Sequence, residues 1–339
     1  MNTFKIDMLL RSCVGLLLVI ALATWGVVLL KAGIYGWTIF VLLPLILGGL
    51  AYWVVRPKTG TGAASVGAAA VIAAACLFLL SGLDGLVCIM MVLPLAVPLG
   101  ALGALLVYHA ESWQYRTRGV TMLLLLSPAT VLCDAKTPPR LFEVRTEITV
   151  AATPEDVWKH VVSFSDLPEP REWFFHAGLA YPKRARIEGS GPGAVRYCEF
   201  STGPFVEPIE VWDEPRLLRF RVTESPAPLE EWSPYATVRP KHLHGYLVSE
   251  RGQFRLTRLP NGHTLLEGST WYQHGLWPAE YWRWWSDAII HRIHLRVLNH
   301  VRMLAEHTER SEIYTSIRQI QPELGSLLTL LPTGKPASQ

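Results

Sequence analysis

Histidine side chains in the last third of this 339-residue chain stand at spacings that are compatible with metal binding. His242 and His244 would place two imidazole rings on one side of an extended segment. His291 and His294 would share one face of a predicted helix. Neither pair belongs to an HExxH motif, and no cysteine pair or carboxylate with recognisable ligand spacing accompanies them. We therefore expect ordinary hydrogen-bonded histidines, no metal ion and no cofactor.

Acid–base catalysis would need a carboxylate or a histidine that faces a cavity and has a shifted pKa. Three candidates stand near the C-terminal end of the chain: Glu267 and His274 on a predicted strand, and Asp287 on the long final helix. Alternation along the strand places Glu267 on the same side as Trp271. A strand glutamate more often faces solvent or pairs with an arginine, as could also hold for Glu199, Glu207 and Glu210. Catalysis is therefore an alternative interpretation.

Aromatic side chains are concentrated around the last two predicted strands and the final helix. Nine of the thirteen tryptophans fall between Trp158 and Trp285. Such rings could line a cavity for an apolar ligand, pack as a core, or rest at a membrane interface. Alternation predicts that the following side chains line a pocket: Tyr246, Phe254, Leu256, Trp271, Trp285 and Ile289. The loop at 226–244, which contains four prolines, would cover the mouth of this pocket.

These candidates depend on a predicted order of strands and helices between residues 142 and 306. A strand at 142–151 leads directly into a helix that Thr153 caps and Pro154 begins. A short helix is expected at 170–177 and a long amphipathic helix at 278–306. Six strands are expected between these two helices, and turn residues separate them. The strands are at 184–188, 194–201, 205–213, 217–223, 246–259 and 263–274. A curved antiparallel sheet of this kind wraps around the long helix, and a cavity is expected between the two.

The C-terminal half resembles the START-like helix-grip (SRPBCC) superfamily, in its polyketide cyclase/dehydrase and lipid transport branch. Three segments carry the resemblance, which covers about residues 144–306: ITVAATPEDVWKHVVSFSDLP, GSGPGAVRYCEFSTGPFVEPIEVWDEPRLLRFRV and RGQFRLTRLPNGHTLLEGSTWYQ. The resemblance implies an α+β helix-grip domain at 143–307. It also implies a cavity that binds a lipid or another apolar molecule, or in which a substrate is cyclised or dehydrated. The fold alone does not decide between binding and catalysis.

The N-terminal part has the composition of a membrane region. Residues 1–110 hold seven charged side chains, whereas the remaining 229 residues hold 52. Four apolar runs are long enough to cross a bilayer, at 13–30, 36–55, 64–83 and 86–108, and a fifth at 119–133 is short. We predict an all-α multi-span region at 1–135 with four or five transmembrane helices. A linker at 136–142 follows, and a short helix with a disordered tail is expected at 308–339.

Basic residues predict the orientation of these helices in a plasma or inner membrane. They precede the first run and follow the second and fourth, against Lys31 alone in the alternate loops, which favours a cytoplasmic N-terminus. If the run at 119–133 crosses, the C-terminal domain lies on the outer or periplasmic face, which we favour; otherwise it is cytoplasmic. Asp84, between two runs, is expected in a turn.

Composition and charge narrow the functional classes. Half of the residues are apolar and the net charge is only +3, which excludes a fully disordered chain and gives no reason to expect a nucleic-acid partner. The leading hypothesis is a membrane-anchored domain that binds a hydrophobic small molecule or lipid at the bilayer. One alternative is a polyketide cyclase/dehydratase-like enzyme that uses the same cavity. A second is a membrane sensing or assembly module, whose protein partners the sequence does not name.

Overall fold

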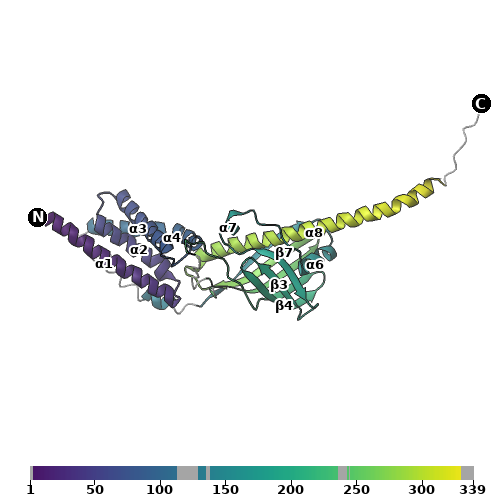
Figure 1. Ribbon diagram of the computed structural model, residues 1–339, viewed down its shortest axis with the longest axis horizontal. Coiled ribbons are helices and arrows are strands. Elements are labelled where there is room, and N and C mark those ends of the chain that lie inside the picture. The colour runs from purple at the N-terminus through teal and green to yellow at the C-terminus, as the bar shows by residue number, and fades with distance from the viewer. Residues whose placement is uncertain (1–2, 113–128, 135–137, 236–242, 244, 330–339) are drawn as a thin grey trace, which may run out of the picture.

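A computed structural model shows four long apolar helices at one end of an elongated molecule and a curved sheet domain beside them (Figure 1). The structure describes residues 3–112, 129–134, 138–235, 243 and 245–329. The first helix begins at one end of the molecule, and the last helix projects beyond the sheet at the other (Figure 1).

The N-terminal helices are consistent with the predicted multi-pass membrane region, and we call them the membrane helices. They are α1 (Thr3–Ala32), α2 (Leu43–Val55) with the preceding π-helical turn η1 (Thr38–Leu42), α3 (Gly60–Leu80) and α4 (Leu86–Ser112). Four segments of them are long and apolar enough to cross a bilayer: Ser12–Ala32, Thr38–Val55, Gly60–Leu80 and Leu86–Ala110. The predicted fifth run at 119–133 lies mostly outside the described residues, so the side of the membrane on which the C-terminal domain lies stays a prediction.

Glycines bring helices α2, α3 and α4 into backbone contact. A Cβ atom added to Gly48 would lie 1.9 Å from the carbonyl oxygen of Gly100, and one added to Gly67 would lie 2.3 Å from the same oxygen. A Cβ atom on Gly103 would lie 2.0 Å from the carbonyl oxygen of Leu45. Only glycine fits at such contacts, and this close packing of small residues is typical of membrane helices.

The C-terminal half is a seven-stranded antiparallel sheet, which confirms the predicted helix-grip class. Neighbouring strands follow the order β1-β7-β6-β5-β4-β3-β2. Their bounds are β1 (Arg140–Val150), β2 (Pro182–Glu188), β3 (Val195–Phe200), β4 (Gly203–Asp213), β5 (Leu217–Arg221), β6 (Leu247–Arg258) and β7 (Thr264–His274). Gly262, in the turn between β6 and β7, has a φ of +84°, as the predicted Asn-Gly hairpin turn requires.

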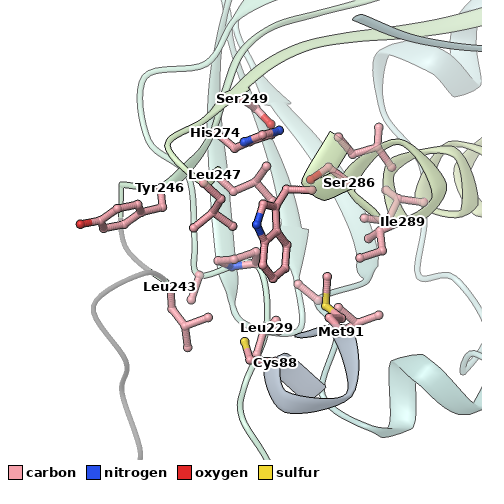
Figure 2. Close-up of a pocket in the computed structure, with 18 of the residues that line it drawn as sticks. Cys88, Met91, Leu229, Leu243, Tyr246, Leu247, Ser249, His274, Ser286 and Ile289 are labelled. Carbon is pink, nitrogen blue, oxygen red and sulfur yellow. The ribbon is translucent and has the colours of Figure 1, made fainter. Parts of the chain in front are cut away.

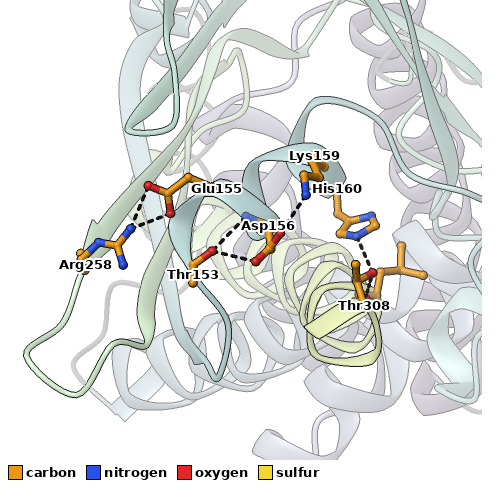
Figure 3. A network of polar contacts seen from close by, with 8 residues as sticks. Thr153, Glu155, Asp156, Lys159, His160, Arg258 and Thr308 are labelled. Atoms are coloured by element: carbon orange, nitrogen blue, oxygen red, sulfur yellow. Dashed lines mark hydrogen bonds and ion pairs between the residues drawn. The ribbon is translucent and has the colours of Figure 1, made fainter. Parts of the chain in front are cut away.

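Helix α6 (Pro154–Val162) closes one end of the sheet and is held by polar contacts in its first turn (Figure 3). Thr153 caps it, because the threonine hydroxyl oxygen accepts a hydrogen bond from the Asp156 amide at 3.4 Å. Glu155 in its first turn accepts two hydrogen bonds from Arg258 at the end of β6, at 2.6 and 2.8 Å. The cap predicted from sequence is therefore present. Helix α7 (Trp173–His176) is a single turn.

The last helix, α8 (Ala279–Thr329), is longer than the sequence predicts. It runs for 51 residues, about 75 Å at 1.5 Å per residue, and passes residue 307 without the break expected there. No glycine or proline stands between Leu304 and Thr315 to stop it. Its first half fills the concave side of the sheet, where Val297, Leu298 and Val301 are buried in the main core. The predicted disordered tail falls partly in 330–339, outside the described residues.

Candidate functional site

An apolar cavity of about 360 Å³ lies where the sheet, helix α8 and the membrane helices meet. The membrane helices contribute side chains to its wall that include Phe40, Ala75 and Val92. The sheet and α8 contribute others that include Phe220, Phe254 and Ile293. Its volume is that of a small-molecule site, and such sites are mostly apolar with a few placed polar groups. The cavity can therefore hold a small apolar molecule.

Direct contacts between the two halves hold this shared wall together. The Tyr246 hydroxyl, at the start of β6, donates a hydrogen bond to the carbonyl oxygen of Gly33 at 2.5 Å. The rings of Phe40 and Trp282 pack with their centroids 4.8 Å apart. Further hydrogen bonds across the junction join Trp277 to Tyr35, Leu86 to Trp232, and Tyr235 to Leu80. The membrane helices are thus a structural part of the cavity.

Three of the six side chains predicted to line a pocket are on the wall of this cavity. They are Tyr246, Phe254 and Ile289. Figure 2 shows Tyr246 and Ile289 with other lining residues around the cavity. They come from the residue before β6, the middle of β6 and the third turn of α8, so the predicted meeting of the last strands with the final helix occurs.

The other three, Leu256, Trp271 and Trp285, lie away from this wall. Leu256 is buried in the main core, because apolar side chains of α8 fill the concave side of the sheet at its level. Trp271 faces the other side of β7, since its neighbours Thr270 and Tyr272 contact α8. Trp285 packs in the aromatic cluster against the membrane helices.

The candidate acids and bases Glu267, His274 and Asp287 have different surroundings in the described part of the chain. His274 lines the cavity. Glu267 forms an ion pair with Arg145. Asp287 accepts a hydrogen bond from the Tyr272 hydroxyl at 2.6 Å and another from Arg283 at 3.1 Å. Burial, together with the hydrogen bond to Asp287, raises the pKa of Tyr272.

Glu207, for which the sequence analysis expects either solvent or an arginine partner, forms a buried ion pair on the cavity wall. Arg196 on β3 and Glu207 on β4 are directly opposite each other in the sheet, and they are only 1% and 6% exposed. The Arg196 guanidinium carbon lies 5.4 Å from the centroid of the Phe220 ring and 5.5 Å from that of Phe254. The turn at 201–202 sets the register of the β3–β4 hairpin. Counting outward from this turn along both strands pairs Arg196 with Glu207.

His291 and His294, whose spacing the sequence analysis notes as compatible with metal binding, share a hydroxyl group. The Thr146 hydroxyl lies 2.7 Å from Nδ1 of His291 and 3.1 Å from Nδ1 of His294. The other ring nitrogen of His294 lies 2.8 Å from the Thr270 hydroxyl. Burial, aided by the neighbouring His291, lowers the pKa of His294 to about 4, so the ring is neutral. His242 and His244 lie outside the described residues.

One group of possible metal ligands occurs among the described residues, at the junction of the two halves. Asp84, Cys88 and Glu231 place their ligand atoms within 4.8 Å of one another. Asp84 lies in the turn between α3 and α4, where the sequence analysis expects it. The Glu231 carboxylate already accepts hydrogen bonds from the amides of Val87 and Cys88, both at 3.2 Å. The group therefore serves first to join the loop before β6 to the start of α4.

Comparison with known proteins matches the sheet domain alone. Residues 142–271 match the family described as polyketide cyclase / dehydrase and lipid transport. No curated protein matches the chain.

Three solved structures illustrate the similarity. Truncated norcoclaurine synthase from Thalictrum flavum is 13% identical, with a TM-score of 0.32, and the match covers 50% of this chain and 96% of that one. The ZhuI aromatase/cyclase from Streptomyces sp. R1128 is 18% identical, with a TM-score of 0.31, over 49% and 94% of the two chains. A protein from Nitrosospira multiformis is 18% identical, with a TM-score of 0.30, over 48% and 94%.

Proposed function

We propose, from the premise that residues 142–271 form a domain of the polyketide cyclase/dehydrase and lipid transport (SRPBCC) family, that the whole protein binds a hydrophobic small molecule or lipid taken from the bilayer. One observation carries the proposal: the wall of the apolar cavity is built jointly by the membrane helices and the sheet domain. A ligand dissolved in the bilayer would therefore meet the cavity from the side on which the membrane helices form its wall.

Physical chemistry favours such a ligand. Removing about 300 Å² of apolar ligand surface from water is worth about 7 kcal/mol at 25 cal/mol per Å². Attachment to the membrane also keeps the cavity close to membrane-dissolved molecules, which raises their effective concentration. The two halves together suit capture of an apolar molecule better than the sheet domain alone.

The alternative of a cyclase/dehydratase-like enzyme keeps one of its three candidate residues. His274 lines the cavity, whereas Glu267 and Asp287 are paired with Arg145 and Tyr272. Glu267→Gln with unchanged behaviour in every assay would count against this alternative. The alternative of a sensing or assembly module draws support from the many contacts between the two halves, such as Tyr246 with Gly33.

The proposal can be tested by native mass spectrometry of the full chain released from membranes. We expect a discrete bound mass of apolar character that disappears on denaturation. Ala75→Phe should abolish it, because Ala75 lines the cavity from α3. Ala73→Phe is the matched control, since Ala73 stands two residues away on the same helix with an exposed side chain. An empty wild-type protein, or equal occupancy in both variants, would refute the proposal.

A further inference from the structure

We propose that the bound molecule carries a hydroxyl group, and that His274 on the cavity wall forms hydrogen bonds with this group. The inference rests on the proposed function and narrows its ligand to an apolar alcohol with either a chain or a ring skeleton. It follows from hydrogen-bonding groups on the wall for which the described part of the chain offers no partner in hydrogen-bond geometry.

His274 is buried, and neither of its ring nitrogens has a partner in hydrogen-bond geometry among the described residues. Its side chain is at the end of β7 and is only 2% exposed, and the backbone groups of Leu276 and Ala279 lie near the ring but outside that geometry. Its ring stacks on Phe142 with the centroids 5.0 Å apart and the planes at 20°, which fixes the direction of both nitrogens. A buried polar group left unsatisfied costs about 1–3 kcal/mol, so a ligand that satisfies it gains affinity.

The surroundings of His274 form a small polar patch in an apolar wall. Trp282 lines the same cavity, and its indole nitrogen also lacks a partner among the described residues. Ser286 stands one turn further along α8, on the same helix face as Trp282. Ser249 faces the same side of the sheet as His274, because the register pairs Leu247 with His274. Figure 2 shows His274, Ser249 and Ser286 at one end of the pocket, with Cys88 and Leu229 at the other.

The donors and acceptors on this patch select a hydroxyl group. Burial lowers the pKa of His274, although the nearby backbone of Leu276 and Ala279 opposes the shift, so the ring is neutral. A neutral imidazole offers one donor and one acceptor, and the Trp282 indole offers one donor. A hydroxyl group both donates and accepts, so it can donate to the imidazole acceptor while it accepts from the Trp282 indole. A ketone or ether has no proton to donate and would leave the imidazole acceptor unpaired.

An acidic ligand fits the wall less well than an alcohol. A carboxylate cannot donate to the imidazole, and its buried charge would need a cation. Arg196 is the buried cation on the described wall, and Glu207 already neutralises it. The remaining polar groups at the patch are uncharged, which again favours a neutral alcohol.

The test uses the full chain in lipid nanodiscs and four probes of similar length. These are 1-dodecanol, dodecyl methyl ether, 2-tridecanone and tridecane, each competing with the neutral dye N-phenyl-1-naphthylamine for the cavity. We expect dodecanol to displace the dye at about tenfold lower mole fraction than the ether or the ketone, as one net hydrogen bond predicts. His274→Phe should bring these ratios close to one, because it removes the hydrogen-bonding nitrogens and keeps an apolar ring.

A matched control is His300→Phe, since His300 is also buried, at 6% exposure, but lies away from the cavity wall. This control should keep the tenfold preference. Equal displacement by dodecanol and the ether, or by dodecanol and the ketone, would overturn the hydroxyl inference and leave the apolar cavity in place. Displacement by none of the four probes would refute the proposed function itself. The wild-type comparison decides between these outcomes even if His274→Phe does not fold.

Discussion

The carboxylates of Asp84 and Glu231 lie within 4.8 Å of each other, although one follows a membrane helix and the other precedes β6. Glu231 binds the amides of Val87 and Cys88, so its negative charge lies at the positive N-terminal end of helix α4. The Asp84 carboxylate accepts a hydrogen bond from the adjacent Gly85 amide and lies beside the second negative charge of Glu231. We therefore expect the junction between the two halves to be sensitive to protonation.

The first prediction concerns the pH dependence of this junction. Burial raises the pKa of Asp84 from 3.8 to about 7, and the charge of Glu231 adds to the rise. A carboxyl group with a raised pKa stabilises the folded protein fully below the unfolded value, and this stability is lost as the pH rises towards 7. Asp84→Asn should remove that part of the loss, a few kcal/mol at most, in thermal unfolding between about pH 4 and pH 8.

Asp166→Asn serves as the control for this experiment, since Asp166 is an exposed carboxylate with 79% of its side chain accessible. It should leave the wild-type pH dependence unchanged. The assignment to Asp84 is wrong if the Asp84→Asn variant loses stability with rising pH as steeply as the wild type.

A second prediction has the opposite sign. Burial lowers the pKa of His294 from 6.5 to about 4, with a further contribution from His291. The resulting stability is present above the unfolded value and is lost as the pH falls from 6.5 towards 4. In an NMR titration, the ring proton signals of His294 should hold their neutral positions down to about pH 5. A midpoint near that of a free histidine peptide would contradict the buried network with Thr146 and Thr270.

The third prediction concerns the buried ion pair. Arg196→Met leaves the Glu207 carboxylate without its partner in an apolar wall, which should cost about 3–5 kcal/mol of unfolding free energy. The double variant Arg196→Met/Glu207→Leu should recover most of this loss, because it removes both charges. Denaturant unfolding measures both values. The control Arg216→Met breaks the exposed 2.9 Å pair with Asp213 and should cost less than about 1 kcal/mol. Similar losses at the two sites would contradict the buried geometry.

The fourth prediction concerns the cap of helix α6. Thr153→Ala removes the side-chain oxygen that accepts the Asp156 amide, and should lower the unfolding free energy by about 1 kcal/mol. Ser190→Ala, in an exposed turn, should stay within about 0.5 kcal/mol of the wild type. A Thr153→Ala variant as stable as the control would contradict a stabilising role for this cap.

Features with local causes could be predicted from the sequence. The cap at Thr153 and the turn at Gly262 depend on residues that are neighbours in the chain, and both occur in the structure. The same holds for the four apolar runs, because the sequence itself shows how many consecutive apolar residues each run contains and whether they suffice to cross a bilayer. The helix-grip class follows from the order of such elements.

Features that depend on distant contacts could not be predicted in full. Alternation predicts which side chains of β6 and β7 share a side of the sheet. The packing of α8 against that side decides where the core ends and the cavity begins. For this reason Phe254 lines the cavity, whereas Leu256 is buried in the core. The membrane side of the cavity depends on contacts such as Phe40 with Trp282, which are more than 200 residues apart. The hydrogen-bond deficit of His274 likewise needs the packed neighbours to be known.

The shared cavity wall makes ligand occupancy a measure of correct assembly. A fragment that begins at Arg140 would contain the sheet and α8 but would lack the wall residues contributed by Phe40, Ala75 and Val92. Only a chain whose helices have docked against the sheet offers the complete site. A ligand that binds this arrangement alone stabilises it by mass action, at about 2.7 kcal/mol when its concentration is a hundred times its Kd. Binding and release of the molecule would then strengthen and weaken the docking of the membrane region against the domain.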